Sequence, residues 1–353
     1  MTDKLPPIYF YIPQNQWSAK DIPESADTYL LDRKLTDGVY AWTLQTYLRL
    51  KNDGFPCQLV GTVPTEGIVF AHQSSLPANL QPRPKLLIVC LQADKEMHPY
   101  AQLHVVPTPQ AEKFNRQGEL WNSYYLPHWP QPGLIPRDRT RGDKFENVAY
   151  FGLERNLAPE LRESSWEEEL KALGLRWDRV TRDRWHDFSQ VDAIVAVRSF
   201  QFHPENKPPQ KLYNSWYAGV PAILGCESAF QAERKSELDY LEVSSFPELI
   251  SALKRLRDDK ELRYAMMENA RFRAEEIRPE ASVLKWRDLI TNKIVPAYES
   301  WCKTSNFTQK ISLIRRYSKF KSHRIKNRIQ SLLFANNKVI IMLKILSFLA
   351  VCD

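Results

Sequence analysis

The sequence contains few cysteines, and their spacing forms no recognisable site. They are Cys57, Cys90, Cys226, Cys302 and Cys352. Their number is odd and none is part of a CxxC or Cys/His cluster, which argues against a disulfide framework or a zinc site and is typical of a reducing cytoplasm. The sequence also lacks a DxD-type carboxylate pair, which would indicate a bound divalent cation. We therefore expect a cytoplasmic protein without a metal ion or a cofactor.

Long apolar runs are absent as well. The chain opens with a polar segment, and the apolar run that follows it, 8–12, is too short for a signal peptide. The final apolar run, 339–351, has thirteen residues and contains Lys344, whereas a helix that spans a bilayer needs about 20. The sequence therefore predicts no transmembrane helix.

Basic charge is concentrated at the C-terminal end. The whole chain has a net charge of +7, but residues 301–353 hold eleven Lys or Arg and one acid, a local charge of +10. The remaining 300 residues come to −3. The globular part therefore shows no footprint of nucleic-acid binding, and we expect no nucleic-acid partner.

The basic C-terminal segment has a pattern of its own. Tyr317, Phe320 and Ile325 are interleaved with its charges, and the final apolar run follows it. This arrangement is typical of a helix at the surface of an acidic membrane. We predict that 310–351 binds an anionic membrane surface peripherally. The alternatives are a helix that packs back onto the protein and an oligomer contact.

Apolar content of 43% and ten tryptophans in 353 residues predict a folded chain of two domains. The first part alternates short apolar runs with a helical pattern that starts at Val39, for which Asp37 is a candidate N-cap. The runs that predict strands are 8–12, 57–60, 68–71, 86–91 and 103–106. Strand, helix and strand at this spacing indicate an α/β fold with a parallel sheet.

Four prolines at 127–136 preclude long regular structure and predict a bridge between domains. Beyond it, Ser165-x-x-Glu168 and Ser245-x-x-Glu248 are capping boxes that predict helices to about 173 and 259. Another helix is expected at 261–276, and His186-Asp187 is expected in a surface turn. The runs that predict strands are 147–152, 191–197, 222–224 and 240–243. We predict domains at 1–137 and 138–280, with helices and the basic tail at 281–353.

The segment 206–225 combines a helix, a turn and a strand. Pro208 and Pro209 are tolerated in a first helical turn, and Gly219 ends the helix before a strand at 222–224. Lys207 and Lys211 therefore lie at a helix start, where free amides and the helix dipole already favour an anion. The segment predicts a cradle for a diphosphate. Two solvated lysines on a surface helix are the alternative.

The same segment resembles the donor-side helix of the two-domain GT-B glycosyltransferases, especially the glycosyl transferases group 1 class. Gly219-Val220-Pro221 matches the small-residue turn of that class, while the two family Glu positions are occupied by Asn206 and Asn214. The resemblance implies two Rossmann-like domains that face across a cleft and a nucleotide-sugar donor. The departure at the two Glu positions leaves open whether the enzyme retains or inverts the anomeric configuration.

The resemblance also implies a set of donor-binding residues. Arg198 follows the strand at 191–197, at the end where ligands bind in an open α/β sheet. Fixed cations there would meet the charge that develops on a leaving diphosphate. The set is Gly152, Arg155, Arg198, Asn206, Lys207, Lys211, Asn214 and Glu227.

A general base, which an inverting enzyme needs, should come from the first domain. The candidates are Asp37, His72 and Asp94. Each has an alternative interpretation, Asp37 as a helix cap and the other two as loop residues at strand ends. No residue is identified as a nucleophile.

Together these patterns predict a cytoplasmic glycosyltransferase, peripheral at the membrane, that acts in polysaccharide biosynthesis. It would move a sugar (a hexose) from a nucleotide-sugar donor to a glycan or a lipid-linked acceptor. The alternative is a non-catalytic GT-B-like binding module in a polysaccharide assembly, which the two asparagines at the Glu positions favour.

Overall fold

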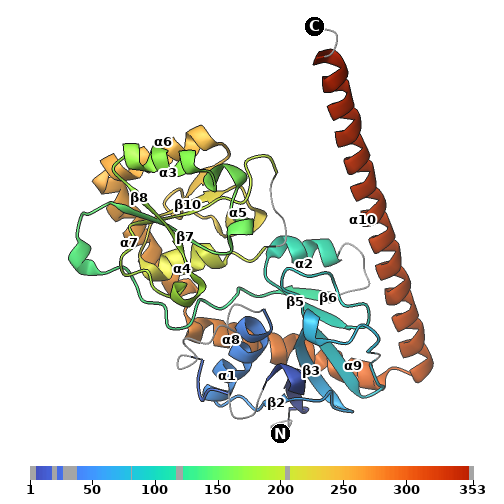
Figure 1. Cartoon of the computed structure of the whole chain (residues 1–353). Helices are drawn as coiled ribbons and strands as arrows, with labels where there is room; N and C mark the ends of the chain where they lie inside the picture. The colour runs from blue at the N-terminus through green and yellow to red at the C-terminus, as the bar shows by residue number, and fades with distance from the viewer. Residues whose placement is uncertain are drawn as a thin grey trace. The chain divides into compact units, whose positions relative to one another are not determined.

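The computed structural model describes residues 5–17, 22–26, 38–80, 82–116, 122–202 and 207–349. The chain divides into two compact units, Met1–Cys302 and Lys303–Asp353, and each is described here by itself. The first unit contains two parallel sheets with helices around them (Figure 1). The predicted α/β class with parallel sheets is therefore confirmed.

The first sheet has the strand order β2-β1-β3-β4-β5-β6, and every neighbouring pair is parallel. Its strands are β1 (Ile8–Tyr11), β2 (Gln58–Val60), β3 (Gly67–His72), β4 (Leu86–Leu91), β5 (Leu103–Val106) and β6 (Asn122–Tyr125). All five strands predicted for this part are present. The strand β6 was not predicted, because its sequence, NSYY, is not an apolar run.

Helices from two distant parts of the chain accompany this sheet. A π-helical segment, Val39–Leu44, continues into α1 (Gln45–Asn52), and α2 (Pro109–Arg116) follows β5. The helix expected from Val39 is therefore confirmed, whereas Asp37 lies outside the described residues. Much later in the chain, α8 (Pro279–Leu289) and α9 (Val295–Lys303) flank a second π-helical segment.

The helix α8 packs onto the first sheet although the second sheet lies between them in the sequence. The Trp286 ring meets Phe70 edge-on, with 6.2 Å between the ring centroids. Arg287 forms an ion pair with Asp53, next to α1. In α9, Trp301 Nε1 donates to the carbonyl oxygen of Arg83 at 3.3 Å. These contacts do not test the domain division expected at 281, which stays a prediction.

The second sheet has the order β11-β10-β9-β7-β8 and is also parallel. Its strands are β7 (Asn147–Phe151), β8 (Arg176–Val180), β9 (Ala193–Ala196), β10 (Ala222–Gly225) and β11 (Leu241–Val243). Its helices are α3 (Ser164–Ala172), α4 (Gln210–Ala218), α5 (Ser228–Glu233), α6 (Phe246–Asp258) and α7 (Lys260–Glu276). The four predicted strands are confirmed. The strand β8 was not predicted, because its sequence, RWDRV, is charged and shows no apolar run.

One of the two predicted capping boxes is wrong. Ser245 caps α6, since its side chain accepts from the amide of Glu248. By contrast, α3 begins at Ser164 after Glu163, with no side-chain cap. Burial of Trp166 and of the residue four positions later sets the start of α3, because these two side chains must face the core.

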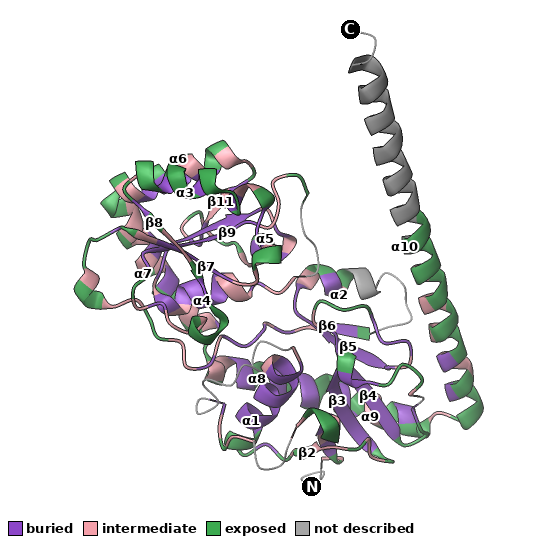
Figure 2. Ribbon diagram, in the orientation of Figure 1, coloured by how far each residue is buried: buried purple, intermediate pink, exposed green. Residues whose placement is uncertain are grey.

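The linker at 127–136 is irregular, as predicted, but it is held on both sides. Trp129 Nε1 donates to Thr46 Oγ1 at 2.7 Å, next to the first sheet. On the second-sheet side, Ile135 exchanges backbone hydrogen bonds with the turn at His186, 2.8 and 2.9 Å long. Figure 2 shows the inner strands of both sheets as buried, with the exposed residues on the outer helices.

The second unit contains α10 (Asn306–Leu349). Its described side chains include exposed apolar residues, among them Ile314, which is 67% exposed, and Ile325, which is 60% exposed. No helix in the described part of the chain combines the length and the apolar content that a membrane crossing requires.

Asp192 links the linker to the start of the second sheet. Its carboxylate is 1% exposed, and it accepts from Arg137 at 2.8 Å, from Arg141 at 2.6 Å and from the amides of Glu146 and Asn147 at 2.9 Å. Burial alone would raise the pKa of Asp192, but the hydrogen bonds from Arg141 and from these amides outweigh burial and lower it.

We expect Asp192→Asn to lower the free energy of unfolding by about 3–5 kcal/mol at pH 7, because two buried guanidinium groups lose their counter-charge. Because the folded pKa is lowered, the contribution is present above the unfolded pKa of about 3.9 and is lost as the pH falls towards the folded value. Denaturant unfolding at pH 7 and pH 3 measures both effects. Asp178→Asn is the control, since Asp178 pairs with Arg184 where both side chains are about half exposed. Equal losses in the two variants would contradict this account.

Candidate functional site

A cavity of about 330 Å³ lies within the first unit, where strands of both sheets end. Gly152 and Arg198 follow β7 and β9 of the second sheet, and Ala93 and Asp94 follow β4 of the first. Within each sheet the parallel strands share a carboxyl edge, and the cavity brings positions from both edges together. The linker and α4 supply much of the remaining wall, from His128 to Pro132 and from Gln210 to Asn214.

Arg198 lines the cavity and is paired from behind. Its Nε lies 3.0 Å from Glu227 Oε1. Glu227 is 2% exposed at the start of α5 and is not part of the cavity wall. The pair fixes the direction of the guanidinium, and among the described residues only its Nε has a hydrogen-bond partner. The expected role of Glu227 as a donor-binding residue stays a prediction.

Lys211 is a cation of this site for which the described residues provide no acidic partner. It lies in the first turn of α4, and its Nζ is 5.4 Å from the centroid of the Tyr150 ring. Across the described residues it makes no hydrogen bond or ion pair. Burial, and next the charge of Arg198, lower its pKa to about 7, although Glu227 acts in the opposite direction. An anion that enters the cavity would restore the proton to this amine.

Lys207 and Asp94 bridge the two halves of the wall. Lys207 Nζ lies 2.7 Å from Asp94 Oδ2, and both side chains are partly exposed. Burial would raise the pKa of Asp94, but the hydrogen bond and the charge of Lys207 outweigh burial and lower it. The pairing weakens Asp94 as a proton acceptor and neutralises much of the charge of Lys207.

Of the other predicted site residues, Gly152 lines the cavity, whereas His72 and Arg155 do not. His72 is 2% exposed, accepts from the amide of Ser74 at Nδ1 and is not part of the wall. Arg155 is exposed on a short 3₁₀ turn, and the next residue, Asn156, lines the cavity in its place. Gly152 lines it too, and a Cβ there would come within 2.7 Å of the Tyr150 hydroxyl. Asn206 and Asp37 lie outside the described residues.

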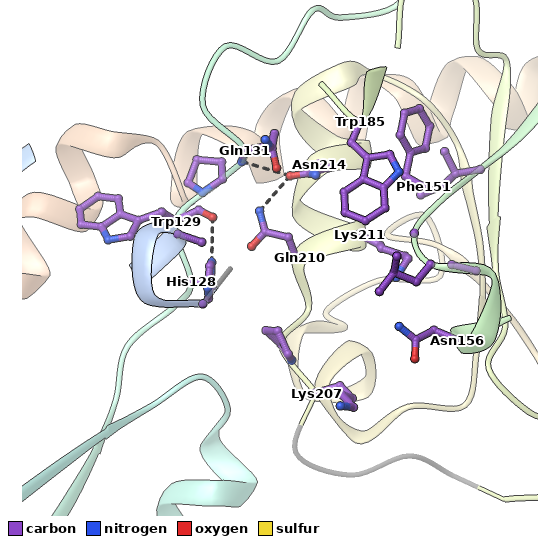
Figure 3. Close-up of a pocket in the computed structure, with 18 of the residues that line it drawn as sticks. His128, Trp129, Gln131, Phe151, Asn156, Trp185, Lys207, Gln210, Lys211 and Asn214 are labelled. Atoms are coloured by element: carbon purple, nitrogen blue, oxygen red, sulfur yellow. Dashed lines mark hydrogen bonds between the residues drawn. The ribbon is translucent and has the colours of Figure 1, made fainter. Parts of the chain in front are cut away.

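Asn214 connects α4 to the linker. Its Oδ1 accepts from the amide of Gln131 at 3.2 Å and from Gln210 Nε2 at 3.1 Å (Figure 3). Asn214 occupies one of the two Glu positions of the resemblance, and we expected it to bind the donor. In this chain, the amide oxygen already has two internal donors, so Asn214 holds the wall in place.

The linker residues that line the cavity were not among the predicted site residues. His128 is 9% exposed, and its Nδ1 lies 3.1 Å from the carbonyl oxygen of Trp129. Burial lowers the pKa of His128. The four prolines led to the interpretation of this segment as a plain bridge. The tryptophan beside the histidine could have indicated a buried segment. A side chain as large and apolar as Trp129 is rarely found in a linker that solvent surrounds.

An aromatic surface forms another part of the wall. Phe151 and Phe188 stack with ring centroids 3.9 Å apart. Trp185 is held by a hydrogen bond from Nε1 to the carbonyl oxygen of Val180, and the Arg182 guanidinium lies 5.5 Å from its ring centroid. Such a surface can stack with a planar ring, while the cations nearby bind anionic groups. Among the described residues, no cluster of three or more His, Cys, Asp or Glu could hold a metal ion.

No protein-family model and no curated protein sequence matches this chain. Several solved structures are similar to it. Sucrose-phosphate synthase from Thermosynechococcus elongatus is 13% identical, with a TM-score of 0.47 over 74% of this chain and 80% of that one. Alr3699/HepE of Anabaena in complex with UDP-glucose is 10% identical, with a TM-score of 0.46 over 81% of this chain and 100% of that one.

The pneumococcal O-GlcNAc transferase GtfA in complex with UDP and GlcNAc is 12% identical, with a TM-score of 0.45 over 72% of this chain and 60% of that one. At these identities and TM-scores, the likenesses carry no argument about the chemistry of this cavity. The resemblance to glycosyltransferases that the sequence indicated is found again among the solved structures similar to this chain.

Proposed function

We propose that this chain is a glycosyltransferase of the GT-B type, with two Rossmann-like domains facing across a cleft. It transfers a hexose from a nucleotide-sugar donor to a glycan or a lipid-linked acceptor. The observation that carries the proposal is the unpaired Lys211 beside Arg198, at the start of α4 and at the carboxyl edge of a parallel sheet. This arrangement supports the binding of a diphosphate.

The chemistry of glycosyl transfer fits this set of groups. When the bond from the anomeric carbon to the diphosphate breaks, negative charge accumulates on the leaving group. Lys211, Arg198 and the free amides at the start of α4 are cations and donors held in place before the reaction. The aromatic surface around Trp185 supports the stacking of a base. A cavity of about 330 Å³ lies within the usual size range of small-molecule sites, roughly 300–1,000 Å³.

A non-catalytic binding module is the second candidate. The observation that favours it is Asn214, whose amide oxygen is occupied by Gln131 and Gln210 in place of a charged carboxylate that faces the donor. Such a module would bind a nucleotide sugar and leave it intact. Release of free nucleoside diphosphate in the presence of donor and acceptor separates the two candidates.

A thermal-shift screen of nucleoside diphosphates and nucleotide sugars tests the binding proposal directly. UDP and UDP-glucose are the first probes, followed by the ADP and GDP forms. A ligand at 100 times its Kd stabilises the fold by about 2.7 kcal/mol.

We expect Lys211→Ala to weaken binding of the selected diphosphate at least about tenfold, because a charge-assisted hydrogen bond contributes about 1.5–3 kcal/mol. Arg198→Ala should act in the same direction. Titration calorimetry measures both. Lys254→Ala, an exposed lysine on α6, is the control and should bind as the parent does. If both Lys211→Ala and Arg198→Ala bind every nucleotide sugar as the parent does, the diphosphate does not bind here.

The lowered pKa of Lys211 predicts a pH dependence of the same binding. Near pH 7 the empty site holds Lys211 in both protonation states, and a bound diphosphate favours the ammonium form. Binding therefore takes up a proton. The affinity for UDP should fall between pH 7 and pH 9, by up to about tenfold per pH unit. Lys211→Arg, whose guanidinium stays protonated, should bind UDP with little change over that range. The same slope in both proteins would assign the titration to another group.

We also propose that 310–351 binds anionic membrane surfaces peripherally. In the described part of α10, basic side chains such as Lys319 and Arg324 alternate with exposed apolar ones such as Ile325. Such a helix combines attraction to anionic lipids with insertion of its apolar side chains. Contact with a membrane would bring the enzyme to a lipid-linked acceptor.

Replacing Lys319, Lys321 and Arg324 together by serine should weaken binding to vesicles with anionic lipids. At about 1 kcal/mol for each charge, the loss is about 100-fold at low salt, and it shrinks as salt screens the attraction. Sedimentation with vesicles measures it. The triple serine variant of Lys254, Arg255 and Arg257 on α6 is the control. Unchanged binding by the α10 variant, or a parent protein that stays in the membrane through alkaline carbonate extraction, would contradict peripheral binding.

A further inference from the structure

Ala93 and Asp94 lie in a strained turn of the cavity wall, directly after β4. Ala93 has a φ of 50°, and it is the single non-glycine residue with a positive φ in the part of the chain that the structure describes. A residue with a Cβ avoids this region unless its surroundings impose it. Two hydrogen bonds of 3.1 Å close the turn, from the Lys95 amide to the Gln92 carbonyl oxygen and from Gln92 Nε2 to the Lys95 carbonyl oxygen. The turn therefore holds Asp94 in a fixed position.

This turn presents a carboxylate to a lysine from the other half of the cavity. Asp94 Oδ2 lies 2.7 Å from Lys207 Nζ, although the two residues are 113 positions apart in the sequence. Asp94 follows a strand of the first sheet, whereas Lys207 comes shortly before α4, which packs into the core of the second sheet. Both residues line the cavity, and each side chain is 36% exposed. An anion that enters the cavity can therefore reach the lysine that Asp94 neutralises.

The other pair of a cation and a carboxylate at this site is built differently. Arg198 pairs with Glu227, which is 2% exposed and is not part of the wall. Breaking such a pair leaves a buried charge without its partner, so an incoming anion would leave it intact. By contrast, a pair of partly exposed side chains changes an equilibrium constant by a factor of about five or less, and a lysine ammonium moves on a flexible stem. Of the two pairs, the one between Lys207 and Asp94 opens more readily.

A diphosphate would offer Lys207 a stronger partner than Asp94. A hydrogen bond between an ammonium group and a phosphate oxygen favours a complex by a factor of at least about ten. Lys211 lies on the same side of the cavity as Lys207 and has no acidic partner among the described residues (Figure 3). The two amines can therefore bind one ligand together. The closed turn keeps Asp94 from following Lys207 into the cavity.

We propose that Asp94 is a positioning residue that holds Lys207 in the empty site, and that a diphosphate takes Lys207 from it. This inference rests on the proposed function. In the empty site, the pair bridges the edges of the two sheets, and the carboxylate takes the place of the ligand. On binding, Lys207 turns from Asp94 to the phosphate oxygens and the bridge opens, while Asp94 stays on its turn. The pair is thus an autoinhibitory contact, and its loss lowers the affinity for a diphosphate.

A double-mutant cycle tests the exchange. The four proteins are the parent, Asp94→Asn, Lys207→Ala and the double variant, and titration calorimetry at physiological salt measures their binding of UDP and of inorganic pyrophosphate. Asp94→Asn should bind both probes more tightly than the parent, because Lys207 is free beforehand. In the Lys207→Ala background, the gain from the same change should be about two- to fivefold smaller, since only the repulsion between Asp94 and the anion remains. The ratio of the two gains isolates the exchange, because that repulsion is present in both backgrounds.

Two further variants are controls. Asp94→Glu keeps the carboxylate and should bind UDP within about twofold of the parent. Asp178→Asn removes a carboxylate from a partly exposed pair with Arg184 and should bind UDP as the parent does. Equal gains in the two backgrounds would mean that Asp94 acts by repulsion alone, and weaker binding by Asp94→Asn would mean that the pair stays closed around the ligand. Either result overturns the exchange and leaves the diphosphate site in place. If neither probe binds to any of the four proteins, the diphosphate site and the exchange both fail.

Discussion

The constraint on which the rest of the structure depends is the crossing of the linker between two parallel sheets. A segment that is buried must satisfy its backbone hydrogen-bonding groups, and it has no sheet of its own in which to do so. Prolines remove four of its donors, and Trp129, Ile135 and Arg137 bind it to both sides. Because it is fixed at both ends, its middle can serve as a wall of the cavity, which an ordinary solvated linker could not do.

The cations of the cavity differ in the groups that lie beside them. Arg198 and Lys207 each have a carboxylate, whereas Lys211 faces an aromatic ring. Burial without a counter-charge lowers the pKa of Lys211 to about 7, so the empty site does not carry a permanently unpaired charge. In the proposed function, an incoming diphosphate would supply that counter-charge. Burial also lowers the pKa of His128, so the same physical effect acts on two basic side chains of the cavity wall.

The two halves of the first unit share more than the cavity. Lys207 bridges to Asp94, and Tyr125 at the end of β6 hydrogen-bonds to Glu233 at the end of α5. The helix α8 returns the chain to the first sheet through Trp286. These contacts join segments that lie 100 or more residues apart in the sequence, and they hold together the parts of the chain that line the cavity.

The sequence by itself determined the α/β class, nine of the strands and the helix that begins after Pro208-Pro209, because apolar periodicity, prolines and glycines act over a few residues. It also placed Lys211 at a helix start and Arg198 beyond a strand. It could not show that Glu227 lies behind Arg198, that Asp94 pairs with Lys207, or that His128 lines the cavity. It missed β6 and β8 because polar and charged side chains interrupt their apolar pattern. Only the tertiary structure decided these points, since the wall extends from Gly38 to Phe230 and local patterns carry no information about contacts over such separations.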